Sequence, residues 1–154
     1  MFTQSSSIII TSSPETIWKL LTDPAVVNQY FPDIKLKIDR YVGGEILFMR
    51  DREGKSYTDK GIITEITPNE SLTYNYRSFW SALPDVPESY FPVSYSLEVL
   101  PKTQTKVTIS QSAETQVKAD EAAKNWVETL TRIKAILDSS SDLNFFTVFS
   151  SLML

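Results

Sequence analysis

Between positions 34 and 109, apolar residues recur at every second position, in runs separated by turn residues. Ile34, Leu36 and Ile38 alternate with charged residues, and Val93 and Tyr95 begin a later run of the same kind. Such alternation is typical of strands with one buried face. Most of the turns between these runs have the length expected between neighbouring antiparallel strands. The sequence therefore predicts an antiparallel meander in the middle of the chain.

Short turns separate most of the predicted strands, and we expect them at Gly43-Gly44, 52–54, 67–71 and 101–104. The Gly43-Gly44 pair predicts a tight hairpin. The connection 81–89 is longer and carries two prolines together with Asp85 and Glu88. Two interpretations stay open for this connection, a pocket lid with rim charges or a rigid surface connection.

Two short helices are expected before the meander. Ser13 is well placed to cap the first helix, and Pro14 fits the first helical position. Apolar residues follow at helical spacing until Pro24 ends the run. Residues 25–31 predict the second short helix.

A long helix is expected at residues 118–138, where apolar residues recur every three or four positions and charged residues fall mostly on another face. It would be roughly 31 Å long, enough to cross a whole sheet. The order of elements favours an α+β domain, in which a curved antiparallel sheet wraps around this helix with a cavity between them.

Composition excludes several kinds of chemistry. The chain has no histidine and no cysteine, so a Ser-His-Asp triad, a thiol nucleophile and a histidine-based zinc site are all excluded. The net charge is −4, and no cluster of Lys and Arg is present to bind nucleic acid. We expect no metal, no cofactor and no nucleic-acid partner.

The two ends of the sequence suggest no membrane span. The first residues lack a positively charged region, so we expect no signal peptide and a cytoplasmic location. Residues 139–154 combine a serine-rich linker with an apolar tail, LNFFTVFSSLML. This tail is too short to cross a bilayer as a helix, which takes about 20 residues. An amphipathic helix would place its phenylalanines against its own domain or against a second copy, forming a homodimer.

Four sequence segments resemble those of a known superfamily: SSPETIWKLLTDPAVVNQYF, RYVGGEILF, KGIITEITPNESLTYNY and NWVETLTRIKAIL. In this order they resemble the START and polyketide-cyclase superfamily with the helix-grip fold. The branch that they resemble is named after the activator of the heat-shock-protein-90 ATPase. The resemblance covers residues 8–138 and implies a sheet of about seven strands with two short helices after the first strand.

This chain departs from the pattern of the family at three places. Asn125 stands where relatives commonly have glycine, Gln111 stands where they often have histidine, and the tail 139–154 has no counterpart. We therefore expect residues 1–138 to form a helix-grip ligand-binding domain and residues 139–154 to form a separate apolar tail.

Aromatic residues are the candidate site. Their rings would converge near one end of the long helix, and tyrosine and tryptophan add polar atoms suited to a hydrophobic ligand with one or two oxygens. A single aromatic residue is more often core packing, so the hypothesis depends on their number. The predicted ligand-binding residues are Tyr30, Phe31, Phe48, Tyr76, Trp80, Tyr95, Trp126 and Leu130.

Charged residues are weaker candidates. Strict alternation sends Arg77 to the face opposite Tyr76, which favours a surface position; a bulge would instead turn it inward toward a ligand carboxylate or phosphate. The acidic pairs are expected to be solvated, and they are Asp51 with Glu53 and Asp120 with Glu121. We assign no catalytic residue.

Three functions stay open. The first is binding of a small hydrophobic or aromatic molecule, lipids included, without catalysis. The second is a polyketide cyclase-like enzyme, in which a tyrosine hydroxyl of Tyr76 or Tyr95 would polarise a carbonyl and the cavity would orient the substrate. The third, implied by the resemblance, is a co-chaperone-like module that binds another protein.

Overall fold

The computed structural model describes residues 1–138. The predicted tail, residues 139–154, and the helix and dimer contact expected of it lie outside the described residues. In chain order the elements are β1 (Phe2–Ile10), α1 (Pro14–Thr22), α2 (Pro24–Tyr30), β2 (Lys35–Ile38), β3 (Glu45–Arg52), β4 (Lys55–Thr67), β5 (Ser71–Arg77), η1 (Phe79–Ser81), η2 (Pro87–Ser89), β6 (Phe91–Leu100), β7 (Gln104–Ala113) and α3 (Gln116–Asp138).

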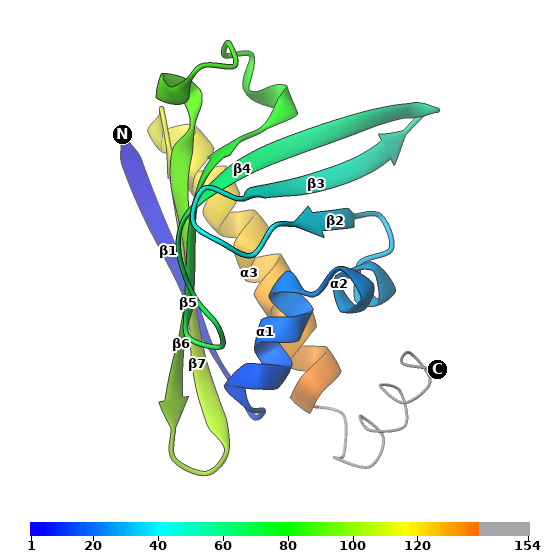
Figure 1. The fold of residues 1–154 in the computed structure, drawn as a ribbon. Coiled ribbons are helices and arrows are strands. Elements are labelled where there is room, and N and C mark those ends of the chain that lie inside the picture. The colour runs from blue at the N-terminus through cyan, green and yellow to red at the C-terminus, as the bar shows by residue number, and fades with distance from the viewer. Residues whose placement is uncertain (139–154) are drawn as a thin grey trace.

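The seven strands form one antiparallel sheet in the order β1-β7-β6-β5-β4-β3-β2. Strands β2 to β7 are therefore a meander, and β1 joins its far edge beside β7. Figure 1 shows α3 running across one face of the curved sheet, with α1 and α2 beside its carboxy-terminal half. The expected helix-grip architecture, α+β with about seven strands and two short helices after the first, is confirmed.

The two short helices are bounded by the residues that the sequence singled out. The Ser13 side chain accepts a hydrogen bond from the Thr16 backbone N–H, and Pro14 occupies the first turn of α1. Asp23 ends α1 and caps α2, because its carboxylate accepts from the Ala25 backbone N–H. One residue thus sets the bend between the helices.

The connection between β2 and β3 is not the tight hairpin that Gly43-Gly44 predicted. It runs through residues 39–44, and its two glycines bond to β4 instead of closing a two-residue turn: Gly43 N donates to the Ile63 carbonyl and Ile63 N to the Gly44 carbonyl, at 2.7 and 2.9 Å. A Cβ on Gly44 would lie 2.2 Å from the Asp39 carbonyl oxygen. Glycine is needed here for close packing of the connection.

The core lies between α3 and the sheet. Ala119, Leu130, Ile133 and Leu137 are the buried residues of α3, and the helix packs mainly against β1 and β7. Buried residues of α1, including Ile17 and Leu20, join the same apolar cluster. Packing therefore closes the carboxy-terminal half of α3 tightly onto the sheet.

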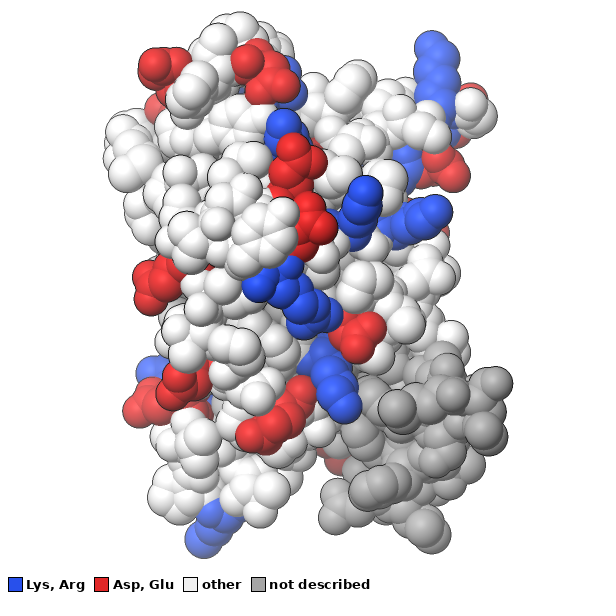
Figure 2. Space-filling model, in the orientation of Figure 1, with Lys and Arg blue, Asp and Glu red and all other residues white. Residues whose placement is uncertain are grey.

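The surface carries both signs of charge. On the face drawn in Figure 2, acidic and basic side chains are interspersed, without an extended patch of one sign. Among residues 1–138, no helix has both the length and the apolar character needed to cross a membrane.

Candidate functional site

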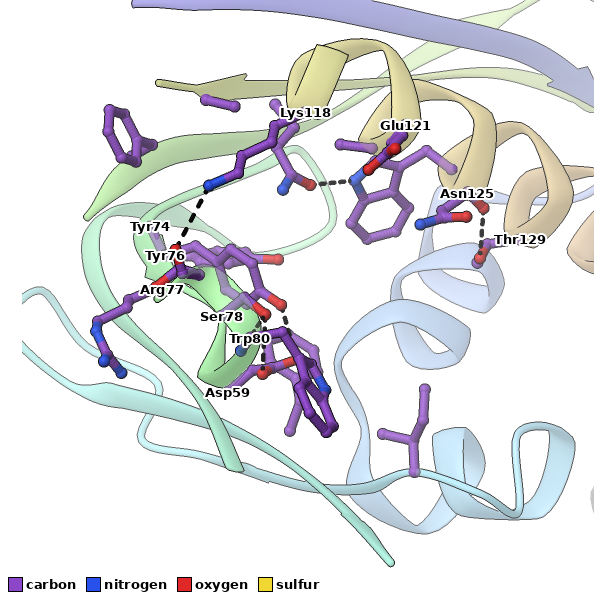
Figure 3. A pocket seen from close by; sticks show the side chains of 18 of the residues that line it. Asp59, Tyr74, Tyr76, Arg77, Ser78, Trp80, Lys118, Glu121, Asn125 and Thr129 are labelled. Carbon is purple, nitrogen blue, oxygen red and sulfur yellow. Dashed lines mark hydrogen bonds between the residues drawn. The ribbon is translucent and has the colours of Figure 1, made fainter. Parts of the chain in front are cut away.

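A cavity of about 480 Å³ lies between the sheet and the amino-terminal half of α3, within the usual size range of small-molecule sites. Its floor is apolar and buried, with Leu20, Leu36 and Ile133 among the lining residues. Polar residues of α3 stand nearer the mouth, where Lys118, Glu121, Asn125 and Thr129 face the tyrosines of β5 (Figure 3). The site is therefore deepest at its apolar end.

Most of the predicted aromatic residues meet at this cavity. The lining includes Phe31 from the end of α2, Phe48 from β3, Tyr76 from β5, Trp80 from η1, Tyr95 from β6 and Trp126 from α3. Their elements are distant in the sequence, and the curvature of the sheet brings them together. Whether these side chains bind a ligand stays a prediction.

Tyr30 and Leu130 are not among the lining residues. Tyr30 ends α2, and its carbonyl accepts a hydrogen bond from Arg132 on the outer side of α3. Leu130 is only 1% exposed and belongs to the packed core. On α3, the neighbouring Thr129 takes the position over the cavity that periodicity alone gave to Leu130.

The aromatic wall is built from edge-to-face contacts. Phe48 meets Tyr76 at a centroid distance of 6.1 Å and an angle of 82°. Tyr74 meets Tyr95 at 5.6 Å and 89°, and Tyr95 meets Trp126 at 5.5 Å and 72°. These geometries are favourable for aromatic pairs. The rings therefore hold one another in place along the cavity wall.

Two hydrogen bonds fix the polar atoms of this wall. The hydroxyls of Tyr74 and Tyr95 are 2.7 Å apart, and Trp126 Nε1 donates to Gln111 Oε1 at 2.7 Å. Burial raises the pKa of Tyr95, and burial together with the Tyr95 hydroxyl raises that of Tyr74 well above its usual range. Both phenols therefore stay protonated at physiological pH. Tyr74 and Gln111 were not among the predicted site residues.

Asp59 is a second lining residue that was not predicted. It lies on β4, is 3% exposed and accepts from four groups. Oδ2 accepts from Arg50 at 3.1 Å and from the Tyr76 hydroxyl at 2.8 Å. Oδ1 accepts from the Phe79 backbone N–H at 2.8 Å and from Ser78 Oγ at 3.5 Å. Figure 3 shows Asp59, Tyr76 and Ser78 gathered at one side of the cavity.

A signal for Asp59 was present in the sequence. Asp59, Gly61 and Ile63 occupy alternate positions, so strand periodicity places the carboxylate on the same face as the buried Ile63. The register adds that Asp59 stands opposite Phe48 of β3. Burial raises the pKa of Tyr76 above its usual range, and the Asp59 charge and its hydrogen bond raise it further.

Arg77 is half-buried and does not have the fully exposed surface position that alternation favoured. It is the last residue of β5, and its Nη2 donates to the Leu83 carbonyl at 2.7 Å. Among the buried side-chain nitrogen and oxygen atoms of residues 1–138, only Arg77 Nε has no hydrogen-bond partner. The side chain thus supports the connection 81–89 and lies along the edge of the cavity.

The connection 81–89 borders the cavity through Ser81, Leu83 and Ser89. The Tyr90 hydroxyl donates to Asp85 and ties the middle of this segment to the residue that follows it. Beside it, Phe79 and Trp80 are 47% and 57% exposed, and both rings pack on Tyr57. The lid interpretation and the rigid interpretation are both compatible with this arrangement.

The other acidic pairs are exposed. Asp51 accepts from Ser56, and Asp120 accepts from Gln4 and Gln116. Glu121 is exposed at the cavity mouth. In the described part of the chain, no three Asp or Glu side chains gather in a way that could hold a metal ion.

The comparisons with known proteins concern nearly the whole of the described chain. The sequence model of the family described as "Activator of Hsp90 ATPase homolog 1-like protein" matches residues 11–138. No curated protein matches the chain.

Several solved structures share the fold. The solution structure of ChR145 from Cytophaga hutchinsonii is 27% identical with a TM-score of 0.76, over 90% of this chain and 94% of that one. The Aha1 dimer from Colwellia psychrerythraea is 23% identical with a TM-score of 0.66, over 90% and 98%. CalU16 from Micromonospora echinospora is 18% identical with a TM-score of 0.68, over 89% and 76%.

Proposed function

This chain belongs to the family of activator of Hsp90 ATPase homolog 1-like proteins, and we propose that its domain binds a small hydrophobic or aromatic molecule. The binding site is the cavity between the sheet and α3. One observation carries the proposal: a cavity of about 480 Å³ is walled by aromatic rings from β3, β5, η1, β6 and α3 and from the end of α2. The ligand-binding unit is residues 1–138.

The size of the cavity supports useful affinity. Burying on the order of 300 Å² of apolar ligand surface yields roughly 7 kcal/mol before the costs of association are subtracted. The apolar floor receives the hydrophobic part of the ligand, and the side chains around Tyr74, Gln111 and Asp59 receive its polar part. Micromolar binding requires neither a metal nor a buried ion pair.

A neutral fluorescent probe tests this proposal. N-phenyl-1-naphthylamine should give a saturable increase in fluorescence with the full chain, and native mass spectrometry should detect a bound molecule in the protein as purified. Ala122 lines the cavity, whereas Val127 on the same helix is 52% exposed and does not. Ala122→Phe should weaken probe binding by about tenfold or more because it fills part of the cavity.

Val127→Phe is the matched control and should leave the affinity unchanged. Equal affinities for the two variants, or the absence of saturable binding to the unmodified chain, would contradict the proposed site.

A cyclase-like enzyme is the second candidate function, and the polar groups around Asp59 favour it. Arg50, Tyr76 and Ser78 converge on this carboxylate at the cavity wall. Against this function, the Tyr76 hydroxyl donates to Asp59 and so is not directed at a substrate carbonyl. Turnover of a linear poly-β-ketone by the unmodified chain, with loss of turnover in Asp59→Asn, would support the enzyme.

A co-chaperone-like module is the third candidate, and the description of the family favours it. Co-purification of heat-shock protein 90 with the tagged full chain, and a rise in its ATPase rate on addition of the chain, would support this function. A chain that binds the naphthylamine probe but leaves the ATPase rate unchanged would support the carrier instead.

Association of two copies is a further part of the proposal. The Aha1 relative from Colwellia psychrerythraea is a dimer, and the apolar residues of 139–154 offer one means of association in this chain. The cytoplasmic location remains a prediction from the sequence.

A further inference from the structure

The hydroxyls of Tyr74 and Tyr95 carry one more hydrogen than their mutual bond uses. Both side chains are buried, at 1% and 2% exposure, and both line the cavity. Their oxygens are 2.7 Å apart, and either can be the donor. Whichever phenol donates, the accepting phenol keeps its own O–H. Within residues 1–138, neither hydroxyl has another acceptor.

Gln111 presents further donors on the same wall. Indole Nε1 is only a donor, so its bond to Gln111 at 2.7 Å identifies the amide oxygen as the acceptor. The Gln111 NH₂ group is thereby directed away from Trp126. No acceptor for it exists among the described residues.

The two sets of donors are close in the sheet. In the pairing of β6 with β7, Gln111 stands opposite Val93, and Tyr95 stands opposite Ile109. Tyr95 and Gln111 are therefore diagonal neighbours on one face, within reach of a single bound group. The indole of Trp126 links them, since it contacts the Tyr95 ring and bonds to Gln111. This part of the wall therefore offers several hydrogens to a bound acceptor.

Neutral donors suit a neutral acceptor. Two cations that line the cavity, Arg50 and Lys118, already pair with Asp59 and Glu114. A carboxylate or phosphate buried against the neutral donors of Tyr74, Tyr95 and Gln111 would therefore bear a large desolvation cost. A carbonyl oxygen has two lone pairs and can accept from a phenol and from an amide at once. An aromatic or aliphatic body attached to that carbonyl would lie among the rings and over the apolar floor.

We propose that the ligand is an uncharged molecule with a carbonyl oxygen, and that the Tyr74–Tyr95 pair and the Gln111 amide donate hydrogen bonds to this oxygen. The inference rests on the proposed function, because it names the ligand class of the same cavity. A pure hydrocarbon of the same shape would leave the remaining hydroxyl hydrogen of the buried Tyr74–Tyr95 pair without a partner, which is costly.

A pair of probes tests separately whether the cavity binds a ligand and whether it prefers a ligand with a carbonyl oxygen. 1-Acetylnaphthalene and 1-ethylnaphthalene differ in having C=O or CH₂ at one position, and each can be titrated against bound N-phenyl-1-naphthylamine. With the full chain, the ketone should bind about tenfold more tightly than the hydrocarbon. Its C=O stretching band should also shift to lower wavenumber on binding, which reports the hydrogen bond directly.

Two variants locate the donors. Gln111→Glu keeps an oxygen for Trp126 but removes the NH₂ donors, and Tyr74→Phe/Tyr95→Phe removes both hydroxyls while keeping the rings. Both should reduce the preference for the ketone and the band shift. Gln104→Glu makes the same change on the same strand, outside the cavity lining, and should alter neither.

The outcomes are distinct. If neither probe binds the unmodified chain, the proposed function fails and the inference fails with it. If both bind equally tightly, the cavity is a binding site and the inference alone is wrong. A ketone preference that persists in both variants would also overturn it.

Discussion

Asp59 joins more parts of the site than any other residue described here. Its carboxylate connects β4 to Arg50 of β3, to Tyr76 of β5 and to the start of η1 at Phe79. A buried carboxylate is costly unless donors surround it, and here three side chains of the cavity wall and the Phe79 backbone N–H donate to it. Asp59 therefore fixes the position of Tyr76 and of the segment that leads to Trp80.

Replacing Asp59 with Asn should destabilise the protein. The variant keeps the size of the side chain, but it removes the charge and turns one acceptor into an NH₂ group that faces the Tyr76 hydroxyl and Arg50. Charged hydrogen bonds are worth more than neutral ones, and Arg50 is partly exposed, so we expect a loss of about 2–3 kcal/mol in the free energy of unfolding. Urea denaturation at neutral pH measures it.

Asp51→Asn is the control for this prediction. Asp51 is exposed, and within residues 1–138 its carboxylate bonds only to Ser56, so its replacement should change stability by less than about 0.5 kcal/mol. Similar losses of unfolding free energy for the two variants would mean that the hydrogen bonds of Asp59 do not stabilise the fold.

The Tyr90 hydroxyl should lose its proton at a higher pH than an ordinary tyrosine does. Burial is the main cause, followed by the hydrogen bond to Asp85 and its charge, and together they raise the pKa of Tyr90 from 10.0 to about 12. Because the folded-state pKa is above the unfolded value, the folded chain keeps this proton between the two values. The resulting stability is fully present below pH 10.0 and is lost as the pH rises through about 12.

Absorbance at the phenolate band, taken as the difference between the unmodified chain and Tyr90→Phe, measures this titration. Asp85→Asn should lower the midpoint, because it removes the charge that favours the neutral phenol. An unchanged midpoint in that variant would show that Asp85 does not control the proton.

The aromatic residues of the site could be predicted because they follow strand alternation, whereas their partners could not. Tyr76 and Tyr95 were placed inward by periodicity, and both line the cavity. The bonds of Tyr74 to Tyr95 and of Trp126 to Gln111 depend on the register between strands and on the position of α3. A single sequence does not contain that register.

Strand β4 shows how one glycine shapes an element and its neighbour. A Cβ on Gly61 would lie 2.6 Å from Ile46 Cγ2 and 2.7 Å from Tyr74 Cδ2. The Tyr74 ring therefore lies across the backbone of β4, in space that any side chain at position 61 would fill. This placement is what brings the Tyr74 hydroxyl to Tyr95.

Gly61→Ala should displace the Tyr74 ring and lower the free energy of unfolding by about 1–3 kcal/mol, because both neighbours are buried and cannot move freely. Urea denaturation measures the loss. Thr58→Ala, at an exposed position of the same strand, should cost less than about 0.5 kcal/mol. A Gly61→Ala variant with unchanged unfolding free energy would show that Ile46 and Tyr74 can move to make room for the added Cβ.

Elements whose ends are set by local chemistry were predicted well. Ser13, Pro14 and Pro24 bound α1 and α2 as expected, and the turn at 52–54 joins β3 to β4. Gly43-Gly44 misled because its function is a contact with β4, made by residues distant in the sequence. Local patterns set the ends of elements, while contacts between elements set the shape of the longer connections.

At the scale of the whole molecule, the cavity exists because large apolar side chains of α3 fill the space over the sheet at one end of the helix only. Its carboxy-terminal half is buried on the sheet through Leu130, Ile133 and Leu137. Its amino-terminal half presents Lys118, Glu121 and Asn125, which are exposed and do not fill the space above the tyrosines. The sequence predicted a cavity near one end of the helix, but the volume follows from the packing of several elements at once.

Removal of residues 139–154 tests the division of the chain into a binding unit and a tail. If residues 1–138 form the ligand-binding unit, the truncated chain should bind N-phenyl-1-naphthylamine within about twofold of the full chain, as expected for independent sites. If the tail joins two copies, sedimentation velocity should show a smaller species after truncation; if it covers its own domain, the oligomeric state should not change. A truncated chain that keeps its circular dichroism spectrum but no longer binds the probe would contradict the assignment of the ligand-binding unit to residues 1–138, because the tail would then supply part of the site.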